Sequence, residues 1–280
     1  EMAEHTVERS NTRQLIITAD DCGLSEGINA ATRDLHRSGL MTTATLMMNF
    51  SAVSHAVHTF REVPTLKTGV HLNLTDGYPL SDIDPASMLV QSDGRFQSRT
   101  VLFPRAIFPN AAWLAAVEGE MTAQIEAYIH QVGRKPHHLT THMHFHILPS
   151  LRDLVLGLAQ RYEIEWVRAF ETSSTVIPYN FFVQEPTELF RPDNLKITPD
   201  YIVSAQAWMN LSPQRLVDTL LSLNGLIELV VHPDDPEDAT YPVEMNHRPD
   251  ERARERDYLL RFAEAMAPHA EAFVIADPSP

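Results

Sequence analysis

Acidic, imidazole and guanidinium side chains follow several short apolar runs in this sequence, at the points where buried strands would end. Metal ligands, proton acceptors and proton donors in enzymes are drawn from these residue types. The carboxyl ends of parallel strands meet at one edge of an α/β fold, so we expect these side chains to converge there. They are Asp20, Asp21, His71, His142, His144, His146, Arg168 and His232.

Three histidines alternate with apolar residues in the run from His138 to Ile147, namely His142, His144 and His146. A strand has a side-chain period of two, so this alternation predicts all three imidazoles on one strand face. A histidine-rich structural strand with hydrogen-bonded rings is the alternative. Because acids and a further histidine end other strands, the pattern favours a metal site.

Asp20 and Asp21 directly follow an apolar run, and two neighbouring carboxylates can divide the work of holding a cation and taking a proton. A helix-capping turn before Ser25 is the alternative for this pair. The only cysteine, Cys22, follows the acids without an obvious base partner, so we interpret it as a packing residue.

His232 stands where the run from Ile227 to Val231 should stop. A histidine there can act as a general acid or base, or it can simply occupy the turn before Pro233. Arg168 ends another run, where its guanidinium can clamp a carboxylate or form a surface ion pair.

Apolar runs and helical periodicity alternate along the chain. The runs predict strands over 15–19, 44–48, 68–74, 138–147, 165–170, 226–231 and 272–276. Helical spacing predicts helices over 28–40, 52–63, 113–132, 151–162, 213–223 and 250–266. This alternation indicates parallel strands in a closed or nearly closed (β/α) barrel, interrupted by long loops over 76–110 and 171–200.

The composition bounds the class of protein. The chain has 280 residues, of which 44% are apolar and 21% charged, as in ordinary globular proteins. Its net charge of −15 disfavours nucleic-acid partners and anionic lipid surfaces. No apolar run approaches the ~18 residues of a membrane helix, so we expect no membrane insertion. We expect a polar tail over 1–12, one domain over 13–280 and a cytoplasmic location, with a homodimer left open.

Four segments together resemble motifs of the YdjC-like (ChbG-like) carbohydrate deacetylases. They are Thr18–Ser25, Gly69–Thr75, Gly133–His146 and Leu229–Pro233, in matching order from about Gln14 to the C-terminal strand. The resemblance implies a deformed (β/α) barrel similar to polysaccharide deacetylases. It also implies removal of an acetyl group from an N-acetylated sugar with the help of one divalent metal ion.

Residue roles are carried over by these motifs. Asp21, His71 and His142 would bind the metal, Asp20 would be the general base that helps to activate water, and His232 would protonate the leaving amine. Arg168, His144 and His146 remain candidates for substrate binding. The family is described with magnesium, whereas imidazole-rich sites favour zinc, so Mg²⁺ and Zn²⁺ both stay open.

The sequence departs from the family pattern at two positions. Cys22 stands where the family usually has Phe, a change that affects packing. Thr140 stands where the family usually has an Asp that would support a histidine ligand.

Other functions use similar residues. A metal-dependent phosphoesterase needs the same ligands but more basic side chains near the site, and a non-catalytic sugar-binding relative would not need Asp20 and His232. A non-haem iron oxygenase would combine His232 and Asp234 with His247, although parallel strands fit it poorly. Candidate sugar-stacking residues are Tyr78, Phe96, Phe103, Trp166 and Trp208.

Overall fold

The first described strand, β1 (Arg13–Cys22), is the apolar run before Asp20, and it is buried from Leu15 onward. A strand with both faces covered reads as a continuous apolar run, which is typical of parallel sheets. β1 pairs in parallel with β10 (Gly225–Val231) on one side and β2 (Thr43–Leu46) on the other. The two acids at its end therefore lie in the middle of the sheet.

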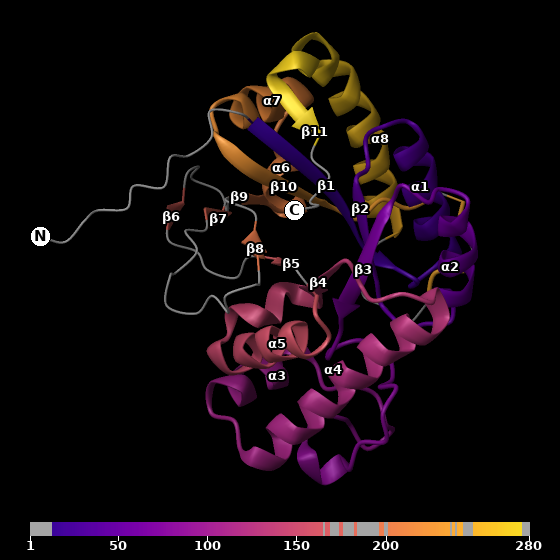
Figure 1. The fold of residues 1–280 in the computed structure, drawn as a ribbon, viewed down its shortest axis with the longest axis vertical. Coiled ribbons are helices and arrows are strands. Elements are labelled where there is room, and N and C mark those ends of the chain that lie inside the picture. Colours follow the sequence, from indigo (N-terminus) through magenta and orange to yellow (C-terminus); the bar gives the residue numbers. More distant parts are fainter. Residues whose placement is uncertain are drawn as a thin grey trace, which may run out of the picture.

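The computed structural model describes residues 13–164, 166–168, 174–175, 182–183, 196–198, 201–235, 237–238, 240–242 and 249–275. The remaining strands are β3 (Lys67–Leu72), β4 (His138–Thr141), β5 (Trp166–Arg168), β6 (Ser174–Thr175), β7 (Phe182–Val183), β8 (Lys196–Thr198), β9 (Tyr201–Val203) and β11 (Phe273–Ile275) (Figure 1). The α-helices are α1 (Glu26–Arg37), α2 (Val53–Arg61), α3 (Arg99–Ile107), α4 (Ala111–Val132), α5 (Pro149–Arg161), α6 (Ala205–Trp208), α7 (Pro213–Leu221) and α8 (Pro249–Met266). Three 3₁₀ helices, η1 (Pro85–Ser87), η2 (His142–Ile147) and η4 (Ala267–Ala272), complete the described elements.

The strands form one curved sheet in the order β6-β7-β9-β10-β1-β2-β3-β4-β5-β8, with β11 added beside β1. All pairings from β9 to β8 are parallel, and β6 and β7 join the β9 edge in antiparallel fashion. Among the described residues no pairing joins β8 to that edge, so the described sheet is a half-barrel. The predicted (β/α) barrel-like fold is confirmed.

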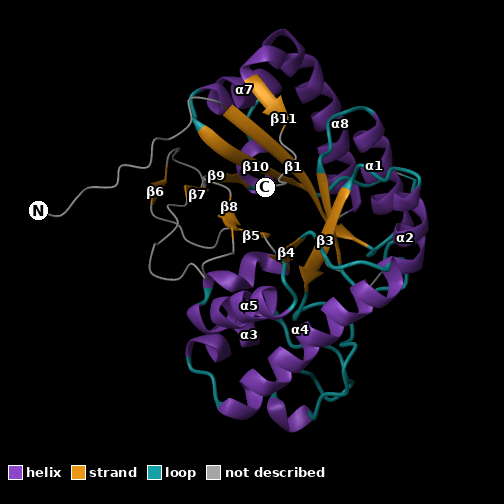
Figure 2. Ribbon diagram, viewed as in Figure 1, coloured by secondary structure: helices purple, strands orange, loops and turns teal. Residues whose placement is uncertain are grey.

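Helices cover the outside of the half-barrel, where α7 packs on α8, α1 on α2 and α3 on α5 (Figure 2). The helix ends follow local sequence signals. The Ser25 hydroxyl accepts the Ile28 N–H at the start of α1, so the capping turn expected as an alternative does form after the two acids. Gly133 ends α4 with a left-handed φ of 78°, as its position predicts.

The predicted strand over 138–147 is wrong beyond Thr141, and with it the prediction that three histidines share a strand face. β3 and β4 stop pairing at Leu72 and Thr141, so no ladder partner supports a longer strand. The backbone turns into η2, where Met143 and His144 adopt left-handed φ values of 57° and 50°. After this turn the imidazoles have different partners: His142 contacts Asp21, whereas His146 contacts Thr141.

The first predicted long loop is partly helical, since α3 and η1 lie within it. Most of the second, over 171–200, lies outside the described residues, as does the predicted tail over 1–12. Within the described part of the chain, no helix combines the length and the apolar character needed to cross a bilayer.

Candidate metal centre

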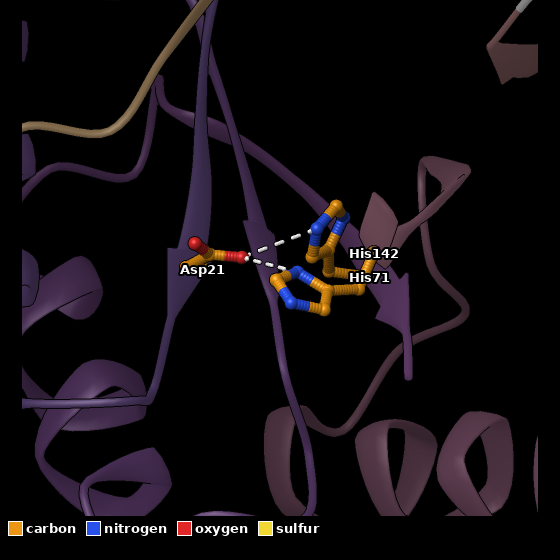
Figure 3. A group of neighbouring side chains, drawn as sticks. All are labelled: Asp21, His71 and His142. Atoms are coloured by element: carbon orange, nitrogen blue, oxygen red, sulfur yellow. Dashed lines mark hydrogen bonds and ion pairs between the residues drawn. The ribbon is translucent and has the colours of Figure 1, made fainter. Parts of the chain in front are cut away.

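Three buried side chains from three strand ends face one another. Asp21 lies at the end of β1, His71 is the second-to-last residue of β3, and His142 directly follows β4. The Asp21 carboxylate points at both rings (Figure 3), with Oδ1 at 3.2 Å from His71 Nε2 and 3.1 Å from His142 Nδ1. Their ligand atoms lie within 4.8 Å of one another. The structure thus brings together the three residues that the sequence predicts as metal ligands.

This donor set fits a divalent cation. One carboxylate oxygen and two imidazole nitrogens are the ligands of catalytic zinc sites, which leave a further position open. In the structure without a cation, the acidic and imidazole groups stabilise each other's charged forms. Burial opposes the charge on His142, yet Asp21 and Asp76 raise its pKa to about 10. Burial likewise opposes the Asp21 charge, but His142 and Arg252 hold its pKa well below the ordinary value.

Each of the three candidate ligands has a second contact behind it. His71 Nδ1 lies 2.6 Å from the hydroxyl of Thr140, and His142 Nε2 lies 2.9 Å from Asp76 Oδ2. Arg252 on α8 donates from Nη2 to Asp21 Oδ2 at 2.6 Å. Thr140, where the family usually has Asp, therefore still contacts a ligand histidine, but as a neutral hydroxyl.

Asp20 belongs to a separate buried network beside the three candidate ligands. Arg168 donates to both of its carboxylate oxygens, at 2.7 and 2.9 Å, and the Thr45 hydroxyl donates to Oδ1 at 2.9 Å. Arg168 also donates to Glu228, a fully buried acid in β10. Burial alone would raise the pKa of Asp20, but the Arg168 guanidinium holds it well below its usual range. Asp20 is therefore ionised at neutral pH.

The position of Arg168 decides between two of its expected roles. It is fully buried, so the surface-pair alternative is wrong, and the carboxylates that it clamps belong to the protein itself. Substrate binding by Arg168 stays a prediction.

His232 follows β10 and pairs with Glu255 of α8. Its Nδ1 lies 3.6 Å from Glu255 Oε1, and its backbone N–H donates to Oε2 at 2.7 Å. Burial disfavours the imidazolium, but Glu255 and Asp21 outweigh it and raise the pKa of His232. A histidine with a raised pKa is well suited to donate a proton.

His144 and His146 lie outside the ligand trio. The His146 ring is buried and contacts the Thr141 hydroxyl, which makes it part of the turn that ends β4. Burial lowers the pKa of His144, and the nearby Arg168 adds to this effect. Their predicted contact with substrate remains a prediction.

Sequence reasoning missed four residues of this site: Asp76, Glu228, Arg252 and Glu255. Glu228 carried a signal, because it is the only charge in the apolar run of β10. Asp76 directly follows the second motif. Arg252 and Glu255 carry none, since a helix in which charges abound offers no sign of which ones point inward.

The other sequence candidates are also placed. Cys22 is buried and its pKa is raised to about 12 by burial, in agreement with a packing role. Phe96, Trp166 and Trp208 are core residues, whereas Tyr78 is 54% exposed. His247, proposed for an oxygenase site, lies outside the described residues.

The fold and the site define a (β/α) barrel-like protein with a buried Asp-His-His centre at the carboxyl ends of its strands. Residues 14–265 match the family described as YdjC-like protein, and the chain belongs to this family.

Two similar proteins are named as deacetylases. A carbohydrate deacetylase of Brevibacillus brevis is 37% identical over 54% of this chain and 57% of its own length. A chitooligosaccharide deacetylase of Salmonella paratyphi B is 32% identical over 52% of this chain and 56% of its own. The matched region thus spans little more than half the length of these relatives.

A solved structure from Enterococcus faecalis V583, described as a candidate cellobiose-phosphate cleavage protein, has the same fold. It superposes with a TM-score of 0.74 at 24% identity, over 95% of this chain and 97% of its own.

Proposed function

We propose that this protein is a metal-dependent carbohydrate N-deacetylase, which hydrolyses the acetamide of an N-acetylated sugar. The observation that carries the proposal is the buried trio of Asp21, His71 and His142 with an ionised Asp20 beside it. The names of the similar proteins support the substrate class.

An amide resists hydrolysis because its carbonyl is weakly electrophilic and its amine leaves poorly. A divalent cation, Mg²⁺ or Zn²⁺, held by Asp21, His71 and His142 supplies Lewis acidity, which polarises a carbonyl and acidifies a water. The site does not need a further ligand for this, since three protein ligands leave positions open.

Asp20 is the proposed general base. Its Oδ1 lies 3.9 Å from Nδ1 of the ligand His71, which places the carboxylate next to the centre. Arg168 keeps Asp20 ionised and fixes its orientation, so it can accept a proton from the attacking water at neutral pH. A carboxylate with so low a pKa is a weak base, and its action therefore depends on a water that is already acidified.

His232 is the proposed general acid. Its raised pKa favours the imidazolium, and the charges of both Asp20 and Asp21 act on it. It can therefore protonate the nitrogen as the bond to the acetyl carbon breaks. This proton transfer is needed because the sugar nitrogen would otherwise have to leave as an anion, which is too basic a leaving group.

A phosphoesterase is less well supported. Two guanidiniums, those of Arg168 and Arg252, do reach the site, but both are paired with carboxylates of the protein. A phosphate group would have to compete with these ion pairs.

The test is acetate release from N-acetylglucosamine oligomers by the metal-stripped protein, with and without added Zn²⁺ or Mg²⁺. We expect activity to disappear on stripping, to return with metal, and to stay absent in His71→Ala. Asp82→Asn, an exposed change in the loop after β3, is the matched control and should keep activity. Phosphate release from sugar phosphates without acetate release would instead indicate a phosphoesterase, and sugar binding without turnover a binding protein.

A further inference from the structure

The two ligand imidazoles are backed by groups of different chemistry. His71 presents Nε2 to Asp21 and has the Thr140 hydroxyl at Nδ1. His142 presents Nδ1 to Asp21 and has the Asp76 carboxylate at Nε2, 2.9 Å away. A hydroxyl can donate or accept, whereas an ionised carboxylate only accepts. Of the two groups behind the rings, Asp76 is therefore the one that favours the hydrogen on the far nitrogen, which leaves the nitrogen nearer Asp21 for a cation.

We propose that Asp76 is the positioning residue of this centre, which holds His142 with its Nδ1 lone pair available for the cation and thereby sets the cation affinity. The inference rests on the proposed metal site. An imidazole that donates its far N–H to a carboxylate has a fixed tautomer and ring orientation and is a more basic ligand.

Asp76 is itself held in place before any cation arrives. Its backbone N–H donates to Asn73 Oδ1 at 3.1 Å, and its carbonyl accepts from the side-chain amides of Asn73 and Asn49, at 2.7 and 3.0 Å. The Thr75 hydroxyl donates to Asp76 Oδ2 at 2.7 Å. Because these bonds are local and already formed, the carboxylate is oriented toward His142 without further ordering.

The support of this loop reaches into the core. Gln124 of α4 accepts the backbone N–H of Asn73 at 2.9 Å and donates to its carbonyl at 2.7 Å. Asn73 and Gln124 are fully buried, whereas the Asp76 side chain is 26% exposed. The Asp76 carboxylate thus lies between solvent and the buried His142 ring, on a loop whose other end is fixed in the core.

The experiment measures Zn²⁺ dissociation constants of the metal-stripped protein by competition with a chelator. Asp76→Asn replaces the carboxylate by an amide of the same shape, which no longer forces the tautomer. We expect it to bind Zn²⁺ about 10–100-fold more weakly than wild type. Asp82→Asn removes the same charge from the same loop and should change affinity by less than about twofold. Asp76→Glu keeps the charge and should recover part of the loss.

A second readout separates positioning from a merely structural role. Nitrogen-15 NMR of the Zn²⁺-loaded wild type should show His142 protonated at Nε2 and unprotonated at Nδ1, and Asp76→Asn should lose this preference. The metal-free proteins should unfold at similar urea concentrations.

The two proposals fail in different ways. If the wild-type protein binds no divalent cation, the proposed function fails. If the wild type binds Zn²⁺ and Asp76→Asn binds it equally tightly with the same His142 tautomer, the role of Asp76 is overturned while the metal centre stands.

Discussion

Two adjacent aspartates at the end of β1 differ only in what their carboxylates touch. Asp20 receives hydrogen bonds from Arg168 and Thr45, whereas Asp21 faces His71 and His142. Asp21 adopts a left-handed φ of 64°, which breaks the strand alternation and lets both neighbours reach one side. Chemically identical neighbours thus have different surroundings at this strand end.

The division of labour between these acids is testable by substitution. Asp20→Asn should keep the cation, because Asp21 remains, but should lose about 10²–10⁴-fold in turnover, as expected for removal of a general base. Asp21→Asn should weaken the cation first, with activity partly recovered at high metal concentration. Metal content and acetate release are measured on the same preparations. If Asp20→Asn strips the metal while Asp21→Asn retains it, the roles are reversed.

The pH dependence of turnover should report His232. Glu255 raises the pKa of His232 above its ordinary value, so the acid form persists as pH rises and is lost only above that raised pKa. In Glu255→Gln the pKa falls, and the alkaline limb of the pH–rate profile should move to lower pH.

Glu264→Gln, an exposed change on the same helix, is the control for this profile and should leave it unmoved. An unchanged alkaline limb in Glu255→Gln would contradict His232 as the general acid tuned by Glu255.

At the scale of elements, the sequence predicted most helices and strands to within a few residues, because buried faces impose a strict period. It predicted β4 as too long, since alternation in the side chains cannot reveal where the neighbouring strand stops pairing. β3 offers no partner beyond Leu72, and the chain turns at Met143 and His144. The short α3 was missed because Pro104 within it argues against a helix.

We expect helix α4 to stabilise the loop that carries Asp76. The buried Glu120 carboxylate accepts the backbone N–H groups of Leu80 and Ser81 and the Ser81 hydroxyl. Glu120→Ala removes the buried carboxylate that accepts these hydrogen bonds, so urea unfolding should show a loss of about 1–3 kcal/mol.

Glu118 on the same helix provides the comparison. It is partly exposed and pairs with Arg161, so Glu118→Ala should cost only about 0–1 kcal/mol. Equal losses in the two variants would show that the loop does not depend on Glu120.

At the scale of the whole molecule, the strand ends of a parallel sheet meet at one edge, and the roles predicted for the residues there stay predictions. Asp21, His71 and His142 needed only that rule to be brought together. Arg252 could not be found this way. It reaches Asp21 across 231 residues of sequence from a helix whose charged residues look alike.

Cation binding should stabilise the whole fold. A ligand that binds only the folded state adds RT ln(1 + [L]/Kd), or about 2.7 kcal/mol at a hundredfold excess over Kd. Urea unfolding with and without Zn²⁺ should show this gain in wild type and little of it in His71→Ala. The same gain in the variant would place the stabilising ion elsewhere.

β1 pairs with β10 and β11, and its Asp21 contacts Arg252, all more than two hundred residues further along the chain. During synthesis on the ribosome, β1 therefore cannot pair with β10 and β11 until nearly the whole chain has been made. Such long-range parallel pairing folds slowly and leaves apolar strand edges exposed in the meantime. The proposed metal centre, with Arg252 behind Asp21, would therefore be complete only after α8 has been synthesised.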